Sequence, residues 1–216
     1  MIFSAKAILF DMDGVLINSA PSVERVWHAW ALAHGFDPAI VIKQAHGRRS
    51  IETIRALAPA MNAEKENVIV EQMEIDDKDD VTALPGAAEL LASLPPDRIA
   101  IVTSATRPLA VARLGYANLP VPPKIITADD VVDGKPSPEP YQKGAALLGF
   151  VANECLVFED TPAGIASAHA AGARAIALRT TYAFDALQAA DAIVPSLAAV
   201  KADFQNGNIV LNVDSL

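Results

Sequence analysis

The chain has 216 residues, of which 52% are hydrophobic, and its 17 Lys and Arg against 26 Asp and Glu give a formal net charge of −9. The hydrophobic content argues against a disordered chain, and the length can bury the core of one ordinary domain with a smaller insert, or of two small domains. The excess of acidic residues argues against a nucleic-acid partner, because nucleic-acid backbones bind basic surfaces.

The single cysteine, Cys155, excludes a disulfide within the chain, and its apolar neighbours are typical of a small buried core residue. No apolar run is long enough to cross a membrane, and the first one is interrupted by Lys6 and stops at Asp11, unlike a signal peptide. We therefore expect a cytoplasmic protein that has no membrane contact and acts as a monomer.

The first predicted element is a buried parallel strand over residues 7–10, which ends at two carboxylates, Asp11 and Asp13. Gly14 then frees the backbone to turn, and ligands of open α/β sheets bind at this end of the strands. Two carboxylates this close repel each other unless a proton or cation lies between them, so we expect Mg²⁺ here. An isolated Asp-x-Asp-Gly is more often a polar turn, and a calcium loop would need a third acid and a distal Glu.

Four helices are predicted next, over residues 20–34, 39–45, 50–58 and 63–77, with no convincing strand between them. Trp27 and Trp30 lie at helical spacing, which favours core packing over the lining of a pocket. From residue 84 the pattern changes to alternating elements: helices at 87–94, 109–114, 138–148 and 162–171, and strands at 99–102, 125–127, 156–158 and 175–178.

This alternation predicts an α/β fold, a doubly wound parallel sheet with helices on both faces, into which an all-helical block is inserted. The strand at 7–10 needs the later strands as neighbours, so residues 1–15 and 84–216 form the expected core and residues 16–83 the insert. Residues 209–213 alternate apolar and polar side chains and suggest a terminal edge strand.

Polar side chains of matching chemistry follow three further strands: Thr103 and Ser104, then Lys135, then Glu159 and Asp160. The carboxyl ends of parallel strands lie along one edge, so these groups should converge on the first two acids. Taken singly, Thr103 could cap a helix, Lys135 could lie on the surface, and the acidic pair could be an N-terminal cap. Together they predict phosphoryl transfer, with a carboxylate to attack phosphorus and donors to hold its oxygens.

At this point the sequence resembles the haloacid dehalogenase-type phosphatases. The stretch Asp11-Met12-Asp13-Gly14 matches the first motif of the family, Thr103 the second, Lys135 the third and Glu159-Asp160 the fourth. The helical insert resembles the family's cap. The stretches 46–50, 102–107, 133–141 and 158–165 are similar to those of glycerol-phosphate, 2-deoxyglucose-6-phosphate and related sugar-phosphate phosphatases.

The resemblance implies that Asp11 is the nucleophile, and that Asp13 protonates the leaving alcohol and then activates water against the aspartyl-phosphate. It also implies a Mg²⁺ ion, with Glu159 near or in its coordination shell and three other ligands: Asp11, the backbone carbonyl of Asp13, and Asp160. The phosphoryl group would be gripped by Thr103, the amides around Ser104, and Lys135.

The cap should select the substrate, and Arg48 and Arg49, in the turn after His46, are the candidate substrate-binding residues. Taken alone, either arginine could equally be a solvated surface residue. We expect a small phosphorylated sugar or polyol. A related phosphoglucomutase would share the motifs but yield an isomer in place of free phosphate. A receiver domain would also use acids, a hydroxyl and a lysine, without a helical insert, and a binding protein without turnover is the remaining alternative.

Overall fold

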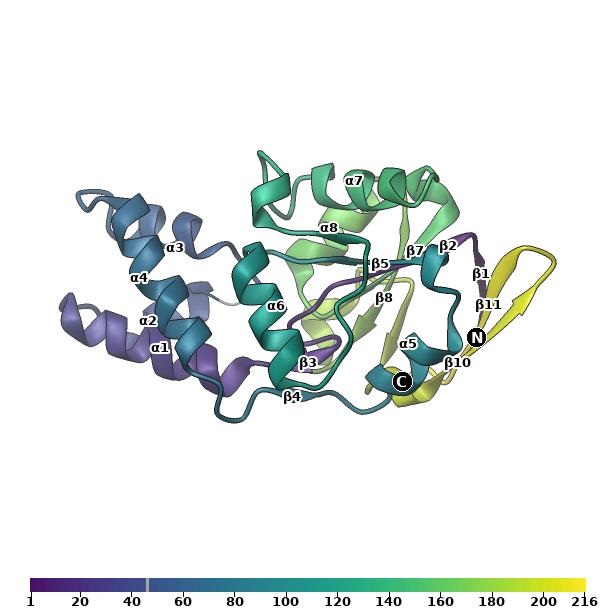
Figure 1. Ribbon diagram of the computed structural model, residues 1–216, viewed down its shortest axis with the longest axis horizontal. Coiled ribbons are helices and arrows are strands. Elements are labelled where there is room, and N and C mark those ends of the chain that lie inside the picture. The colour runs from purple at the N-terminus through teal and green to yellow at the C-terminus, as the bar shows by residue number, and fades with distance from the viewer. Residues whose placement is uncertain (46) are drawn as a thin grey trace.

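The computed structural model describes residues 1–45 and 47–216 (Figure 1). His46, which begins the turn singled out in the sequence, lies outside the described residues. None of the described helices is both long and apolar enough to cross a membrane.

The main sheet has six parallel strands in the order β6-β5-β2-β7-β8-β9. Their bounds are Ile125–Ile126 (β6), Ile99–Val102 (β5), Ala7–Phe10 (β2), Cys155–Glu159 (β7), Arg174–Leu178 (β8) and Ala192–Val194 (β9). Strand β2 lies between β5 and β7, and Phe10 pairs in register with Ile101 on one side and Phe158 on the other. The carboxyl ends of three neighbouring strands therefore meet at one edge.

Helices cover both faces of this sheet, so the predicted α/β doubly wound fold is confirmed (Figure 1). Alternation along β2 sends Leu9 to one face, against α7 (Glu139–Leu147) and α8 (Pro162–Ala170). Its neighbours Ile8 and Phe10 point to the other face, against α5 (Ala87–Ser93) and α6 (Arg107–Tyr116). Strand β2 is fully buried, as the continuous apolar run of residues 7–10 predicted.

A second, antiparallel sheet has the order β1-β11-β10, with bounds Ile2–Ala5, Asn208–Val213 and Val200–Gln205. The expectation of an edge strand at 209–213 is therefore wrong. This segment is the central strand of the smaller sheet, because β1 and β10 pair with its two sides. The buried side chains of β11 join the same hydrophobic core as α5 and α6.

The predicted helical insert is present, and in the described part of the chain it has four helices: α1 (Ala20–Ala33), α2 (Pro38–Ala45), α3 (Ser50–Leu57) and α4 (Ala63–Asp76). They stand beside the sheet as a separate block with its own core, which includes Trp27, Trp30 and Ile54 (Figure 1). The two ends of the insert also pair, as the antiparallel strands β3 (Ile17–Asn18) and β4 (Thr82–Ala83), which the sequence did not predict. We propose that this ribbon marks the boundary between a core of residues 1–15 and 84–216 and a cap of residues 16–83.

Candidate active site

The polar residues expected at the strand ends do lie together, around one cavity of about 410 Å³ between the sheet edge and the cap. The cavity wall includes every core residue that the sequence singled out: Asp11, Asp13, Thr103, Ser104, Lys135, Glu159 and Asp160. Backbone pairing brings the ends of β2 and β7 together, since Asp11 N donates to the carbonyl oxygen of Phe158 at 2.9 Å. The site is therefore built on three adjacent strands of a rigid sheet.

Lys135 lies at the centre of the buried charges. Its Nζ donates to Asp11 Oδ1 and to Glu159 Oε1, both at 2.6 Å, and to the carbonyl oxygen of Val102 at 3.2 Å. Burial disfavours the ammonium, but the two carboxylates outweigh it and raise the pKa of Lys135 above its usual value. The lysine is therefore charged and aimed at the nucleophile candidate, and the alternative of a surface lysine is excluded because Lys135 is buried.

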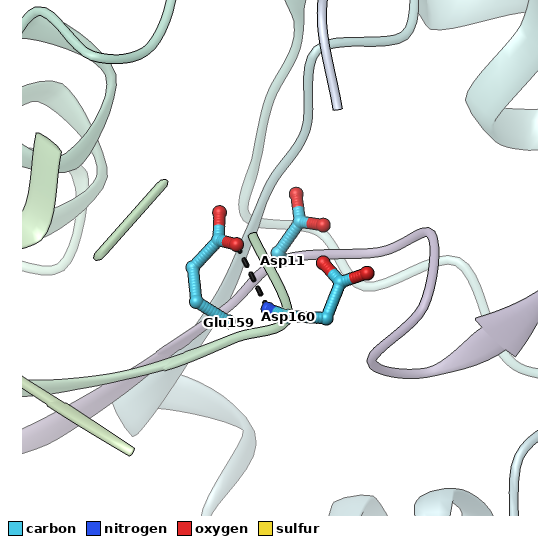
Figure 2. A group of neighbouring side chains, drawn as sticks. All are labelled: Asp11, Glu159 and Asp160. Atoms are coloured by element: carbon cyan, nitrogen blue, oxygen red, sulfur yellow. Dashed lines mark hydrogen bonds between the residues drawn. The ribbon is translucent and has the colours of Figure 1, made fainter. Parts of the chain in front are cut away.

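The carboxylates of Asp11, Glu159 and Asp160 have oxygens within 4.8 Å of one another, and Figure 2 shows them rising from the ends of β2 and β7. Burial raises the pKa of Asp11 to about 7, against the lowering effect of Lys135. Burial, together with the charges of Glu159 and Asp11, raises the pKa of Asp160 well above its usual value. Burial opposes ionisation of Glu159 as well, but Lys135 prevails and lowers the pKa of that carboxyl.

Asp160 Oδ1 is the carboxylate oxygen that this cluster leaves buried with no hydrogen-bond partner among the described residues. Glu159 is the opposite case, because its oxygens accept five hydrogen bonds from described groups: Lys135, Tyr141, the amides of Asp160 and Thr161, and the Thr161 hydroxyl. A buried acceptor without a donor, in a cluster in which Asp11 and Asp160 resist ionisation, fits a hard divalent cation bound through carboxylate oxygens. These residues therefore suit a divalent cation, the class to which Mg²⁺ belongs.

Gly14 allows the turn after Asp13 to pass against Asp160. Its φ is +78°, and a Cβ at this position would lie 2.0 Å from Asp160 Oδ2. Any other residue would push this carboxylate out of place, in addition to straining the backbone. The sequence indicated the turn, whereas the close approach depends on a residue 146 positions later in the chain.

Thr103 is buried at the end of β5, and its Oγ1 accepts a hydrogen bond from the amide of Ala105 at 3.1 Å. No acceptor for the hydroxyl hydrogen is found among the described residues, so it stays available for an oxygen in the cavity. The alternative of a helix cap at Thr103 does not hold, because α6 begins at Arg107 and its N-cap residue is Thr106. Ser104 follows on the cavity wall.

Asp13 is held by two donors that sequence reasoning did not identify. Its Oδ1 accepts hydrogen bonds from Ser19 Oγ at 2.5 Å and from Arg113 Nη1 at 3.0 Å. Tyr141 was also missed as a site residue: its buried hydroxyl donates to Glu159 Oε1 at 2.9 Å. None of these three has a local signal, because each is a common residue type whose partner lies on another element.

The two cap arginines occupy different positions. Arg48 is among the described residues that line the cavity, with Trp27 and Lys43 beside it on the cap side, whereas Arg49 is not. The guanidinium of Arg49 is paired with Glu52 and donates through Nη2 to the carbonyl oxygen of Val132 at 3.1 Å. Arg49 therefore joins the cap to the core loop that precedes Lys135.

Comparison with known proteins gives a consistent assignment. The model of the family "haloacid dehalogenase-like hydrolase" matches residues 5–172. Hexitol phosphatase A of Escherichia coli is 40% identical over 212 residues, which cover 95% of this chain and 98% of that protein. Glycerol-1-phosphate phosphohydrolase 2 of Saccharomyces cerevisiae is 37% identical over 194 residues, covering 84% of this chain and 78% of its own length.

Among solved structures, a hydrolase from Pseudomonas syringae superposes with a TM-score of 0.80 at 25% identity, covering 89% of this chain and 94% of the other. The expected resemblance is thereby confirmed in sequence and in fold. The matched segment spans the motifs after β2, β5 and β7, and thus the whole edge on which the acidic cluster lies. This chain belongs to the haloacid dehalogenase-like hydrolases.

Proposed function

We propose that this chain is a phosphatase that hydrolyses the phosphate monoester of a small sugar or polyol, through a phosphoryl group carried on Asp11. Similarity to proteins named as phosphatases assigns it to the phosphoric monoester hydrolases. The proposal that Asp11 carries the phosphoryl group rests on its contact with Lys135 at the base of the cavity. This contact lies beside the Asp160 oxygen that has no partner among the described residues. Such a base suits a phosphoryl group, whose oxygens need cationic partners.

In the first step, one oxygen of Asp11 attacks phosphorus and the bond to the leaving alcohol oxygen breaks, while Asp13 gives that oxygen a proton. In the second step, Asp13 removes a proton from a water molecule, which attacks phosphorus, frees Asp11 and yields inorganic phosphate. Thr103, the amides around Ser104, and Lys135 hold the phosphoryl oxygens in both steps.

Asp11, the backbone carbonyl of Asp13, and Asp160 would hold a Mg²⁺ ion, with Glu159 beside them, and its charge would offset the repulsion between carboxylate and phosphate. The raised pKa values of Asp11 and Asp160 support this assignment, because a cation is what would let both acids ionise. The five hydrogen bonds that Glu159 accepts favour a role in orienting Lys135.

The names of the relatives support a phosphorylated polyol or sugar as the substrate class. The cavity wall agrees, because the cap adds both acids and bases to an aromatic face: Glu24, Trp27, Lys43, Arg48 and Glu71. Carboxylates and cations bind hydroxyl groups, and an aromatic ring packs against the C–H face of a carbon chain. We propose that Arg48 contacts the hydroxyl-bearing part of the substrate. Arg49, which lies where the cap contacts the core, would bind the same part of the substrate.

The test is to incubate the purified protein and Mg²⁺ with a panel of hexitol, hexose and glycerol phosphates and to measure inorganic phosphate, with a chelated sample as control. Repeated release of phosphate that stops on chelation is expected. Isomer formation without phosphate would favour a mutase. A single phosphorylation without turnover would favour a receiver or binding protein.

A further inference from the structure

A buried arginine of the core, Arg113 on α6, stands between Asp13 and the cap. Its Nη1 donates to Asp13 Oδ1 at 3.0 Å, and its Nη2 lies 3.5 Å from Oε2 of Glu74 on α4. The side chains of Arg113 and Glu74 are only 5% and 6% exposed. One guanidinium thus contacts the proposed proton carrier and a helix of the cap at the same time.

The contacts at Asp13 are made on one oxygen. Both hydrogen bonds that Asp13 accepts from described side chains, those of Ser19 and Arg113, go to Oδ1. A carboxyl group that transfers protons needs one free oxygen, and an anchored partner oxygen fixes the direction in which the free one points. Oδ2 is therefore the oxygen placed to exchange a proton with the leaving group and with water.

Folding stability alone does not explain the ion pairs of Arg113. Burying charges costs free energy that a pair regains only with good geometry and complete hydrogen bonding. Nε and Nη2 of Arg113 have no hydrogen-bond partner among the described residues, and the contact of Nη2 with Glu74 is long. A methionine would fill this space without the desolvation cost, so the charge indicates a role beyond packing.

A second contact fixes the same end of the cap helix. Tyr116, three residues after Arg113 on α6, donates its hydroxyl to the carbonyl oxygen of Ile75 at 2.6 Å. Residues three apart lie on one face of a helix, so α6 holds two consecutive residues of α4, Glu74 and Ile75. The end of α4 and the guanidinium beside Asp13 therefore share one docking surface.

We propose that Arg113 is a positioning residue that links cap helix α4 to Asp13. The charge of Glu74 pairs with the guanidinium, whose Nη1 in turn holds Oδ1 of Asp13, so that Oδ2 faces the leaving-group oxygen only when α4 is docked on α6. The inference rests on the proposed phosphatase function, and it adds a polar link between the cap and the proton-transfer step.

The test compares Arg113→Met, Arg113→Lys and the control Val111→Ala, which changes an exposed residue of the same helix. Arg113→Met should lower kcat on an alkyl phosphate on the order of tenfold to a hundredfold with little change in KM, the size of a lost charged hydrogen bond. Arg113→Lys, which keeps a charged donor, should recover part of the loss, and Val111→Ala should stay near wild type. Thermal unfolding of each variant reports on folding.

Leaving-group dependence separates positioning from structural damage. The first-turnover burst from para-nitrophenyl phosphate needs no proton donor, because para-nitrophenolate is a good leaving group, so Arg113→Met should keep this burst rate within about twofold of wild type. In an Asp13→Asn background, Arg113→Met should cause no further loss on the alkyl phosphate. An equal loss with both substrates, or the same loss in the Asp13→Asn background, would overturn the proposal.

If Arg113→Met does not fold, Glu74→Gln supplies the same comparison from the cap side. Glu74→Gln should lower kcat on the alkyl phosphate by a smaller factor than Arg113→Met does. In an Asp13→Asn background it should cause no further loss. A wild-type kcat for Glu74→Gln would refute the link to the cap. Failure of the wild-type protein to release phosphate from any substrate would refute the proposed function itself, and the two outcomes are therefore distinct.

Discussion

Lys135 Nζ lies 2.6 Å from Asp11 Oδ1, and both groups are buried at the base of the cavity, so the proposed nucleophile and its cation form a largely shielded ion pair. The same ammonium contacts Glu159 at 2.6 Å, so one positive charge is shared by two carboxylates. A second cation is needed before all three buried acids can be charged, and this requirement links the geometry of the site to its expected metal dependence.

Replacing Lys135 by Met should affect catalysis and stability together. Loss of one phosphate-binding donor costs about 10²- to 10³-fold in kcat, and breaking a buried ion pair costs about 3–5 kcal/mol of folding free energy. Lys135 lowers the pKa of Asp11, so its removal should move the acid limb of the pH–rate profile upward. Phosphate release between pH 5 and 9 and urea unfolding would check this; an unmoved acid limb would separate Lys135 from Asp11.

Metal binding should be coupled to proton release. Because burial raises the pKa of Asp11 to about 7, metal-free sites hold protons on this carboxyl at pH 6 that they have lost at pH 8. Mg²⁺ must displace those protons, so its affinity should rise about tenfold from pH 6 to pH 8. Calorimetry in two buffers of different ionisation enthalpy would count the protons, and Asp160→Asn should abolish most of the binding. An affinity independent of pH would contradict the role of these acids.

Glu139 gives a prediction for the loop that carries Lys135. Its carboxylate accepts hydrogen bonds from the amides of Asp133 and Val132 and pairs with Lys143, which together lower its pKa to about 2. A depressed folded-state pKa contributes stability above the unfolded value, here 4.5, that is lost as the pH falls toward 2. Glu139→Gln should therefore destabilise the protein at pH 7, and its difference from wild type should shrink below pH 4.5.

Urea unfolding at pH 7 and pH 3 would measure that difference. The matched control is Glu89→Gln, since Glu89 lies in the first turn of α5, as Glu139 lies in the first turn of α7, but is exposed. The control should show little change at either pH. A difference between Glu139→Gln and wild type that is the same at both pH values would mean that its charge is not what matters.

The cap arginines should separate substrate recognition from phosphate binding. Arg48→Ala should lower kcat/KM for the best polyol or sugar phosphate on the order of tenfold to a hundredfold, because a hydrogen bond from a charged donor is lost. Arg49→Ala should act in the same direction, and also loosen the contact with Val132. Both should affect para-nitrophenyl phosphate much less, because it has no hydroxyl groups. Equal losses on both substrates would make these arginines phosphate ligands.

The parts of the site that could be predicted from the sequence are those in which one short segment carries the whole signal. The apolar run that ends at Asp11 and Asp13 predicts a strand. Because ligands bind at the carboxyl ends of such strands, the position of the two acids follows from it. Helix and strand alternation predicted the order of the main elements between residues 84 and 178 to within a few residues, but not strands β9 and β10 beyond them. Lys135 was singled out by its place after the predicted strand at 125–127, and the family resemblance supported it, but its contact with Asp11 joins residues more than a hundred positions apart.

The missed features depend on distant partners. Arg113 lies on a helix with an ordinary amphipathic pattern, and only the packing of α4 on α6 buries it. Strand β1 is short and pairs only with β11, almost at the other end of the chain, among the described residues. Local propensity carries no information on such contacts. The central position of β11 was mistaken for an edge because neither neighbour had been predicted.

The most direct test of the account is the turnover of Asp11→Asn on the best alkyl phosphate found with wild type. An amide cannot form the acyl phosphate through which both steps pass, so this variant should release no inorganic phosphate above background while unfolding as cooperatively as wild type. Acid-quenched wild-type enzyme should carry one phosphoryl group on the peptide that contains Asp11, and the variant none. Phosphate release by carefully purified Asp11→Asn at the wild-type rate would contradict the central claim.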